Sequence, residues 1–398
     1  MIVGTAAALA LTLTPVSAPA TGLVPGPRVN LRDFIFNLGL LVPVGVGLRL
    51  RGWRLGPITA GVLALSGGIE LLQLLLPLGR DASLLDVVAN SSGAVIAAWA
   101  VPQIPRALAV SSIGARWFVA AGLLAWAVQA ALTAWALQRD IPATAEYWGQ
   151  WAHVFSATKP LTGVVTDFMV QGAVIADGPV PNTDALRAAL VADTVTLYVA
   201  ARDLGPSAGR AQIAAIAHGE GTHVAGFERY GCVIKFRVRV RGERVGLRAA
   251  GVVVPTSCRL QPGITVITGR AARDARTITV RWDQETRQAT LQLAPSLGWR
   301  LLVPLSWSWR GGAWDVLGSV LWLALWGAPV AMWLQIAWPR NLPVAALFYV
   351  IGLLGGTAVV AVVSGLSVGT RGDIIGVALG WLIGGWLNAR RVASWYLS

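Results

Sequence analysis

Charged residues are scarce in this sequence. They make up 13% of its 398 residues, whereas hydrophobic residues make up 55%. In ordinary soluble domains roughly one residue in four is charged. The scarcity excludes a wholly soluble globular protein, and we therefore expect lipid to surround much of the chain.

Acidic residues are scarcer than basic ones, with 19 Asp and Glu residues against 32 Lys and Arg residues and a net charge of +13. The excess comes almost wholly from arginine. In a soluble protein such a charge would suggest nucleic acid as a partner. Here the basic residues fall in short loops between apolar runs and in one polar segment, so we expect no nucleic acid partner. A positive-inside topology and an anionic ligand of the cell envelope explain them better.

The sequence has only two cysteines, Cys232 and Cys258, and both fall in its one long polar segment. A disulfide between them would require an oxidising compartment. The sequence leaves open whether they pair.

Long apolar runs dominate both ends of the chain. Runs that approach the roughly 20 residues of a spanning helix lie near residues 1–23, 33–49, 56–78, 84–101, 115–137, 314–337, 342–368 and 373–388. They predict seven or eight spans, in membrane regions 1–139 and 313–398 that flank residues 140–312. The first run is either a cleaved signal peptide or a retained span, because Ala18-Pro19-Ala20 is typical of a cleavage site whereas a basic n-region is absent.

Arginines are distributed unequally over the loops between these runs. If the amino terminus starts inside, the inner loops and tail hold Arg49, Arg51, Arg54, Arg106, Arg116, Arg340, Arg390 and Arg391, whereas the short outer loops hold Arg28, Arg32, Arg80 and Arg371. The positive-inside rule then predicts that residues 140–312 lie outside.

Short alternating runs replace the long apolar ones between residues 160 and 300. They are Thr194–Ala200, Gln212–Ala217, Cys232–Val240, Ile264–Thr268, Thr277–Trp282 and Thr290–Leu293. Short strands separated by turns predict one antiparallel β-sandwich, so the predicted fold class is a polytopic α-helical membrane protein with one external β-domain. The order of the strands, including Ile216-Ala217-His218-Gly219 and Cys232-Val233-Ile234-Lys235-Phe236-Arg237, resembles the concanavalin A-like or laminin G-like fold.

Polar side chains recur at helical spacing inside three of the amino-terminal apolar runs. They are Asp33 and Asn37, then Ser66, Glu70 and Gln73, then Asp86 and Asn90, with Arg80 in the turn before the last pair. Ionisable groups in spanning helices are costly and indicate function or tight pairing. The predicted topology places all of them at the external helix ends, as a single outward-facing site.

These residues also carry a family resemblance. The segments Asp33-Phe34-Ile35-Phe36-Asn37, Pro43-Val44-Gly45, Ser66-Gly67-Gly68-Ile69-Glu70-Leu71-Leu72-Gln73, Arg80, Asp86-Val87-Val88-Ala89-Asn90 and Gly93 resemble the motif of VanZ-like proteins over residues 30–100. The resemblance implies the bacterial cell envelope, in an inner or cytoplasmic membrane. It also implies a link to glycopeptide resistance, which is associated with the family's namesake, and it brings no settled chemistry.

The last apolar hairpin repeats this pattern in degenerate form. Arg371, Asp373 and Gly380 echo Arg80, Asp86 and Gly93, with the same seven-residue step from Asp to Gly. Val377 stands where Asn90 would be. We expect this hairpin to complete the bundle and to lend Arg371 and Asp373 to the same polar face.

Two patterns in the polar segment suggest ligands. Lys235, Arg237, Arg239 and Arg241 alternate with apolar residues, so one strand face is cationic. It is either a solvated outer face or a binding surface for phosphate or carboxylate groups of envelope polymers. The second pattern is a run from His218 to His223, which could place three ligands around a cation but lies where a hairpin turn is expected. We therefore predict no metal or other cofactor. Calcium bound to the β-domain is the alternative.

The predicted function is binding, not catalysis, of an envelope polysaccharide, lipid-linked glycan or membrane lipid at the outer membrane face. The polar cluster contains no histidine, no cysteine and no serine with a partnered base, so no catalytic residue is assigned. Two alternatives stay open: a transporter or flippase built on the repeated hairpins, and an intramembrane enzyme acting on lipid head groups. A purely structural network of paired charges is the simplest competing explanation of the cluster.

Overall fold

The computed structural model describes residues 30–75, 83–143, 146–154, 158–218, 222–248, 250–259, 261–302 and 313–395. The chain divides into two compact units, with the boundary between Val110 and Ser111. Within the described residues, seven segments are long and apolar enough to cross a membrane: Leu31–Leu50, Leu55–Gln73, Leu84–Ala107, Ser112–Leu137, Asp315–Ala337, Leu342–Ser364 and Arg371–Arg391. The predicted multi-pass architecture is confirmed. The run near residues 1–23 and its cleavage site lie outside the described residues.

The first unit contains three of these segments. Its helices are α2 (Leu31–Leu40), α3 (Val42–Leu50), α4 (Leu55–Leu75), α5 (Leu84–Ala100), the 3-10 turn η1 (Val101–Gln103) and α6 (Ile104–Leu108). Pro43 near the start of α3 has no N–H to donate, so α2 and α3 form one span that is interrupted at Leu41. Leu41, Ile58, Val62 and Ala94 form the buried centre of this bundle.

Two glycines set the distance between the first span and α5. A methyl group at Gly45 would overlap the backbone carbonyl of Ala94, and one at Gly93 would overlap that of Leu38. Small residues let helices in lipid approach until their backbones touch. The glycines of the sequence motif therefore serve helix packing, which brings the polar residues of α2 and α5 close together.

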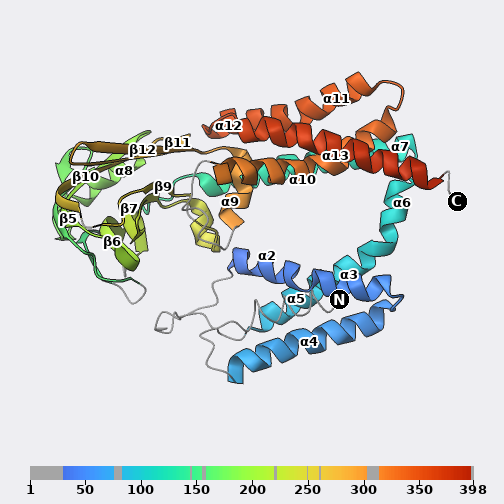
Figure 1. Ribbon diagram of the computed structural model, residues 1–398, viewed down its shortest axis with the longest axis horizontal. Helices are drawn as coiled ribbons and strands as arrows, with labels where there is room; N and C mark the ends of the chain where they lie inside the picture. The colour runs from blue at the N-terminus through green and yellow to red at the C-terminus, as the bar shows by residue number, and fades with distance from the viewer. Residues whose placement is uncertain are drawn as a thin grey trace. The chain divides into compact units, whose positions relative to one another are not determined.

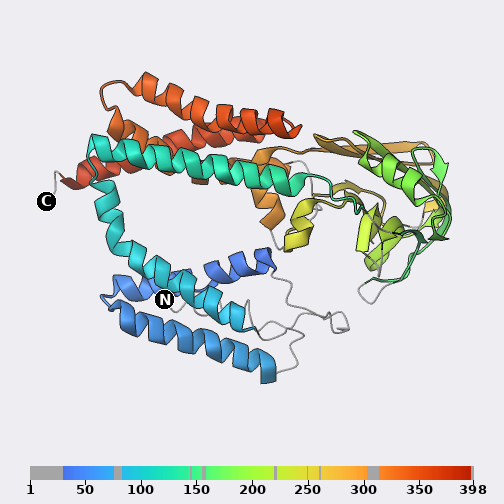
Figure 2. The same ribbon diagram turned by 180° about the vertical axis from the view of Figure 1, so that it is seen from behind.

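The second unit contains the other four spans, visible side by side in Figures 1 and 2. They are α7 (Ser112–Leu137), α10 (Ala313–Ala337), a continuous span of α11 (Leu342–Val350), the π-turn η5 (Ile351–Gly355) and α12 (Gly356–Ser364), and finally α13 (Arg371–Trp395). Trp126, Leu323, Tyr349 and Leu353 are buried between them. The sequence grouped α7 with the amino-terminal membrane region, but its packing on α10 and α12 joins it to the carboxy-terminal helices.

The β-domain lies between α7 and α10 in the chain, and its two antiparallel sheets have six strands each. One sheet has the order β4-β1-β6-β7-β8-β9 and the other β12-β11-β10-β5-β2-β3. The strands are β1 (Tyr147–Trp151), β2 (Val164–Val170), β3 (Ala173–Val174), β4 (Gly178–Pro179), β5 (Val195–Leu204), β6 (Ser207–His218), β7 (Thr222–Gly231), β8 (Val233–Val238), β9 (Val252–Pro255), β10 (Gln261–Ala271), β11 (Ala275–Trp282) and β12 (Glu285–Gln292). The predicted β-sandwich is confirmed.

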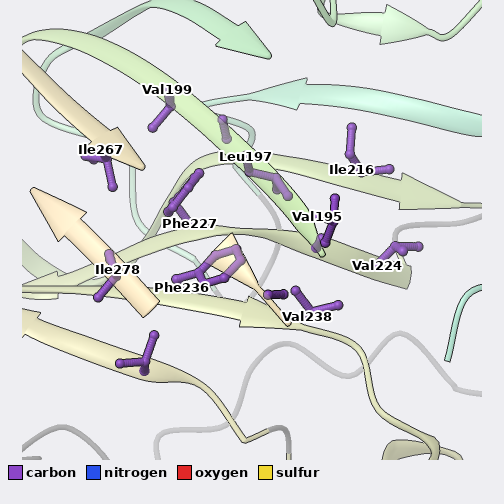
Figure 3. Close-up of a cluster of buried hydrophobic side chains, with 14 of the residues drawn as sticks. Val195, Leu197, Val199, Ile216, Val224, Phe227, Phe236, Val238, Ile267 and Ile278 are labelled. Atoms are coloured by element: carbon purple, nitrogen blue, oxygen red, sulfur yellow. The ribbon is translucent and has the colours of Figure 1, made fainter. Parts of the chain in front are cut away.

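The core of the sandwich follows from period-two alternation along the strands. In β8 every second residue is buried, and Phe236 and Val238 have no exposed surface. Figure 3 shows these side chains meeting Val195, Leu197, Phe227, Ile267 and Ile278 between the sheets. Helix α8 (Thr183–Val191) adds Leu186 and Leu190 to the same core.

The β-domain is attached to the helices of its unit at both chain crossings. On entry, Arg241 N–H donates to the Gln138 carbonyl at 2.8 Å, and Asp140 N–H donates to the Arg239 carbonyl at 3.0 Å. On exit, η3 (Pro295–Leu297) and α9 (Gly298–Leu302) pack on the helices. Buried Arg300 in α9 pairs with Asp315 of α10 at 2.9 Å and donates to the Gly251 carbonyl at 3.0 Å. At the described residues of both crossings, the domain is therefore bonded directly to the helices of its unit.

Candidate functional site

The described first-unit residues of the predicted site gather at one end of the helices. They are Asp33, Asn37, Ser66, Glu70, Gln73, Asp86 and Asn90, called here the polar cluster. Asp33 lies in the first turn of α2, Glu70 in the last turns of α4, and Asp86 in the first turn of α5. Because α4 runs antiparallel to its neighbours, these three positions share one end of the bundle.

Hydrogen bonds connect the helices through this cluster. Glu70 Oε2 accepts from the backbone N–H of Ser83, the residue that precedes α5, at 2.7 Å. That N–H belongs to the helix start, where no intrahelical carbonyl is available. The Asn90 amide donates to Ser66 Oγ at 3.1 Å, and the Asn37 side chain bonds the Asp86 carboxylate. The cluster therefore fixes how α2, α4 and α5 meet, which supports part of the structural interpretation.

The cluster carries more negative charge than its described neighbours neutralise. Asp86 lies within electrostatic reach of both Glu70 and Asp33. Asp33 is paired with Arg32 at 2.9 Å and is half exposed, whereas Glu70 is 8% exposed. The predicted counter-charge Arg80 lies outside the described residues. Such a group of carboxylates and amides suits a ligand that donates hydrogen bonds, such as a sugar hydroxyl or an ammonium group.

One acceptor in the cluster has no donor among the described residues. Asn90 is 2% exposed, and its Oδ1 is buried with no hydrogen-bond partner among the described residues. An unsatisfied buried polar atom costs about 1–3 kcal/mol. A network built only for packing would be expected to satisfy it, so this atom favours a ligand over a purely structural role.

Arg371 and Asp373 belong to the second unit, and their predicted place in the same polar face stays a prediction. Asp373 is 2% exposed and accepts from Thr370 N–H at 2.9 Å, Thr370 Oγ1 at 3.0 Å and Ser296 Oγ at 2.9 Å. These bonds tie the start of α13 to η3, at the exit from the β-domain. Arg371 is exposed at the first position of α13.

The cationic row of the β-domain is shorter than the sequence predicted. Lys235 and Arg237 lie on β8, and Arg239 follows directly, but Arg241 is not on the strand. It begins the 3-10 turn η2 (Arg241–Val245), because Glu243 accepts from Val240 N–H at 3.0 Å and Gly246 turns the chain at φ +78°. Arg241 therefore lies beyond the end of the strand that carries the row.

Acidic side chains neutralise part of the remaining row, which is therefore not a freely solvated strand face. Glu228 lies 2.6 Å from Arg210 and 3.6 Å from Arg237, and Arg237 also lies 3.5 Å from Glu243. Burial would raise the pKa of Glu228, but Arg237, Arg210 and Lys235 outweigh it and hold the pKa at about 2. Burial also lowers the pKa of Lys235 to about 8. Binding of a polymer anion here would compete with these internal acids.

Asp140 holds the other end of the row. It is 3% exposed, lies 2.9 Å from Arg239 and also pairs with Arg244. The hydrogen bond from Arg244 is the largest cause that lowers the pKa of this carboxyl; burial opposes it and the charge of Arg239 reinforces it. Asp140 and Glu228 were not predicted from the sequence, although acidic residues are rare in this arginine-rich segment and stand out for that reason.

We expect Asp140→Asn to destabilise the β-domain by roughly 1.5–3 kcal/mol at neutral pH, because it removes hydrogen bonds to charged partners. A lowered folded-state pKa contributes stability that is present above the unfolded value of 3.8 and is lost as pH falls through the folded value. The difference between wild type and variant should therefore stay constant from pH 7 to 5 and close below about pH 4. Thermal unfolding over this pH range measures it. A gap of the same size at every pH would contradict the assignment, and exposed Asp184→Asn is the control.

The two cysteines lie at the edge of the first sheet. The structure joins Cys232 to Cys258 by a disulfide that closes the loop around β9. Under this loop, fully buried Arg229 donates to the carbonyls of Gly231 and Ser257 at 3.2 and 3.1 Å.

Within the described residues, no group of three or more His, Cys, Asp or Glu side chains is placed to hold a metal ion. Of the predicted histidine run, residues 219–221 lie outside them. His223 has a pKa of about 4, lowered first by burial and then by Arg237. The calcium alternative stays a prediction.

Comparison with protein families finds one match, in the amino-terminal region. Residues 5–105 match the model of the VanZ/LLP1 family, a stretch that includes the whole polar cluster. Neither the curated proteins nor the solved structures contain a match to the chain. The amino-terminal region is therefore VanZ-like, and the resemblance of the β-domain to concanavalin A-like folds stays a prediction.

Proposed function

We propose that this multi-pass protein binds an envelope lipid, lipid-linked glycan or glycan at the outer face of a bacterial cytoplasmic membrane, and does not convert it. The observation that carries the proposal is the polar cluster, which keeps the buried carboxylate of Glu70 and an Asn90 acceptor without a partner among the described residues in apolar helices. Ionisable groups within spanning helices indicate function or tight pairing. The match of this region to the VanZ/LLP1 model adds the envelope context and makes glycopeptide susceptibility a phenotype to measure.

Two features support an outer location for the β-domain. The short loops on its side of the spans hold fewer arginines than those on the other side, as the positive-inside rule requires. The disulfide between Cys232 and Cys258 suits an oxidising compartment.

Binding is favoured over turnover by the composition of the cluster. Among its described residues, the titratable groups are carboxylates, and the hydroxyl of Ser66 is engaged by the Asn90 amide at 3.1 Å. A nucleophile needs a base within hydrogen-bond reach, and this serine has an amide there instead. Carboxylates and amides bind hydroxyl and ammonium groups without further chemistry.

The test is native mass spectrometry of the intact protein, purified gently from bacterial membranes. We expect a discrete lipid or glycolipid adduct on the wild type. It should fall at least about tenfold in Asp86→Asn, which removes the half-buried charge at nearly constant volume. Asp184→Asn, the same change at an exposed position of α8, should keep the adduct.

Each other outcome counts against a stated part of the proposal. Equal adducts on both variants and the wild type would remove the polar cluster as the binding site. A bound species whose mass changes on incubation with envelope lipids would show that the protein converts its ligand, and would contradict the proposal of binding without catalysis.

A further inference from the structure

The second unit contains a cavity next to the ends of α7 and α12. The cavity of about 340 Å³ is lined by Leu137 and Gln138 at the end of α7, by Val363, Ser364 and Leu366 at the end of α12, and by Arg139, Arg241, Arg273 and Arg276. Its volume falls in the roughly 300–1,000 Å³ of small-ligand pockets. Four of the lining residues are arginines, and none is acidic.

The arginines of the cavity are incompletely neutralised. Arg273 pairs with Asp193 at 2.7 Å, but both side chains are mostly exposed, at 66% and 79%, where such pairs contribute little. Arg139 donates to the carbonyls of Leu190, Ala192 and Asp193 and meets no carboxylate in these bonds. Arg241 is exposed, and its guanidinium has no ion pair among the described residues. The nearby acids, Asp193 and Asp274, do not line the cavity.

Arg276 is the most unusual of the four. It is 1% exposed, donates only to the carbonyls of Ala272 and Ala275, and has a buried Nε without a partner among the described residues. Burial, followed by the charge of Arg139, lowers the pKa of this guanidinium to about 9. A buried cation without a carboxylate partner is costly unless an anion joins it.

The four guanidinium groups favour an anionic ligand with several oxygens. Arginine donates paired N–H groups that match the oxygens of phosphate, so a cluster of arginines binds phosphate more specifically than a diffuse positive surface does. The residues of α12 beside the cavity favour a phospholipid over a soluble phosphate compound. Val362 and Val363 are 70% and 83% exposed at the end of a spanning helix, so an acyl chain can lie along them while its head group enters the cavity.

We propose that this cavity binds the phosphate of a membrane lipid head group, held by Arg139, Arg241, Arg273 and Arg276 where α7 and α12 leave the bilayer. The cavity belongs to the second unit and the polar cluster to the first. This inference goes beyond the function proposed above, and either can fail alone.

The test titrates the purified full chain, in a neutral detergent, with dioctanoyl phosphatidylglycerol and follows binding by calorimetry. We expect saturable binding that weakens at least about tenfold in Arg241→Gln/Arg273→Gln. Both arginines are exposed, so their loss should leave the melting temperature unchanged. Arg202→Gln/Arg281→Gln, which removes two exposed arginines outside the cavity, should bind as the wild type does.

Two further probes separate the sources of the ligand. Dioctanoylglycerol has the chains without the phosphate, and glycerol 3-phosphate has the phosphate without the chains; both should bind at least about tenfold more weakly than the phospholipid. Equal binding of dioctanoylglycerol would overturn the phosphate site. Equal binding of glycerol 3-phosphate would overturn the lipid assignment in favour of a soluble phosphate compound.

The remaining variants complete the test. Unchanged affinity in Arg241→Gln/Arg273→Gln, or equal losses in both double variants, would overturn the cavity assignment. The Asp86→Asn variant should bind phosphatidylglycerol as the wild type does. A loss confined to Asp86→Asn would move the phospholipid site to the polar cluster.

Discussion

Replacing Gly93 by alanine is expected to disrupt the first unit. The added methyl group would overlap the Leu38 backbone carbonyl, and a backbone cannot step aside as a side chain can. Overpacking costs typically about 1–3 kcal/mol, and we expect a value at or above the top of this range. Net stabilities are only about 5–15 kcal/mol for a domain, so the variant should melt much earlier than the wild type in detergent.

The matched control is Gly68→Ala, in α4. A methyl group there meets nothing within 4 Å, and alanine is the better helix former by about 1 kcal/mol. Its melting temperature should therefore equal or exceed that of the wild type. If both variants melt alike, the close approach of α5 to the first span is not what the unit depends on. Gly45→Ala should behave as Gly93→Ala does, because it meets the Ala94 carbonyl.

Truncation of Phe236 is expected to have the largest effect on the β-domain. Its ring is fully buried, lies 5.2 Å from that of Phe227, and packs against Gly269 in the opposite sheet. Phe-to-Ala substitutions in cores cost about 3–5 kcal/mol through lost burial and the cavity that remains. Amide hydrogen exchange in β8 and β10 of the full chain should become faster, by the factor that this loss of stability implies.

Two companions test the cause of this effect. Phe236→Leu keeps most of the apolar volume and should cost less than Phe236→Ala. Val164→Ala removes a side chain that is 65% exposed on β2, and surface changes of this kind stay within about 0.5 kcal/mol. Comparable losses in Phe236→Ala and Val164→Ala would show that the core between the sheets does not limit the stability of the domain.

The architecture was predictable where the sequence repeats a simple period. Twenty-residue apolar runs identify spanning helices because a bilayer requires that length, and alternation in residues such as Phe236 and Val238 identifies the buried face of a strand. Which helices pack together was not predictable. The partners of α7 follow from contacts such as Trp126 Nε1 to Thr357 Oγ1 at 3.2 Å, across 231 residues of sequence.

The candidate site was predictable to a similar depth. Helical spacing placed Glu70 and Asp86 at the same bundle end, but it could not show that Glu70 accepts the Ser83 N–H. Alternation placed Arg241 in the cationic row, because a strand continued past Val238 looks the same in sequence as one that ends in a 3-10 turn. The arginine cavity could not be predicted from the sequence, because its arginines come from segments that are far apart in the chain, near residues 139, 241, 273 and 276.

The two-sided attachment of the β-domain to its helices has a mechanical consequence. The bonds of Asp140 and Gln138 at its entry, and of Arg300 and Asp373 at its exit, hold it against the helices at the described residues of both crossings. At these contacts the sandwich is therefore restrained relative to the ends of the helices in its own unit. A pulling force on the sandwich would be transmitted through these bonds to the helices and would change their tilt.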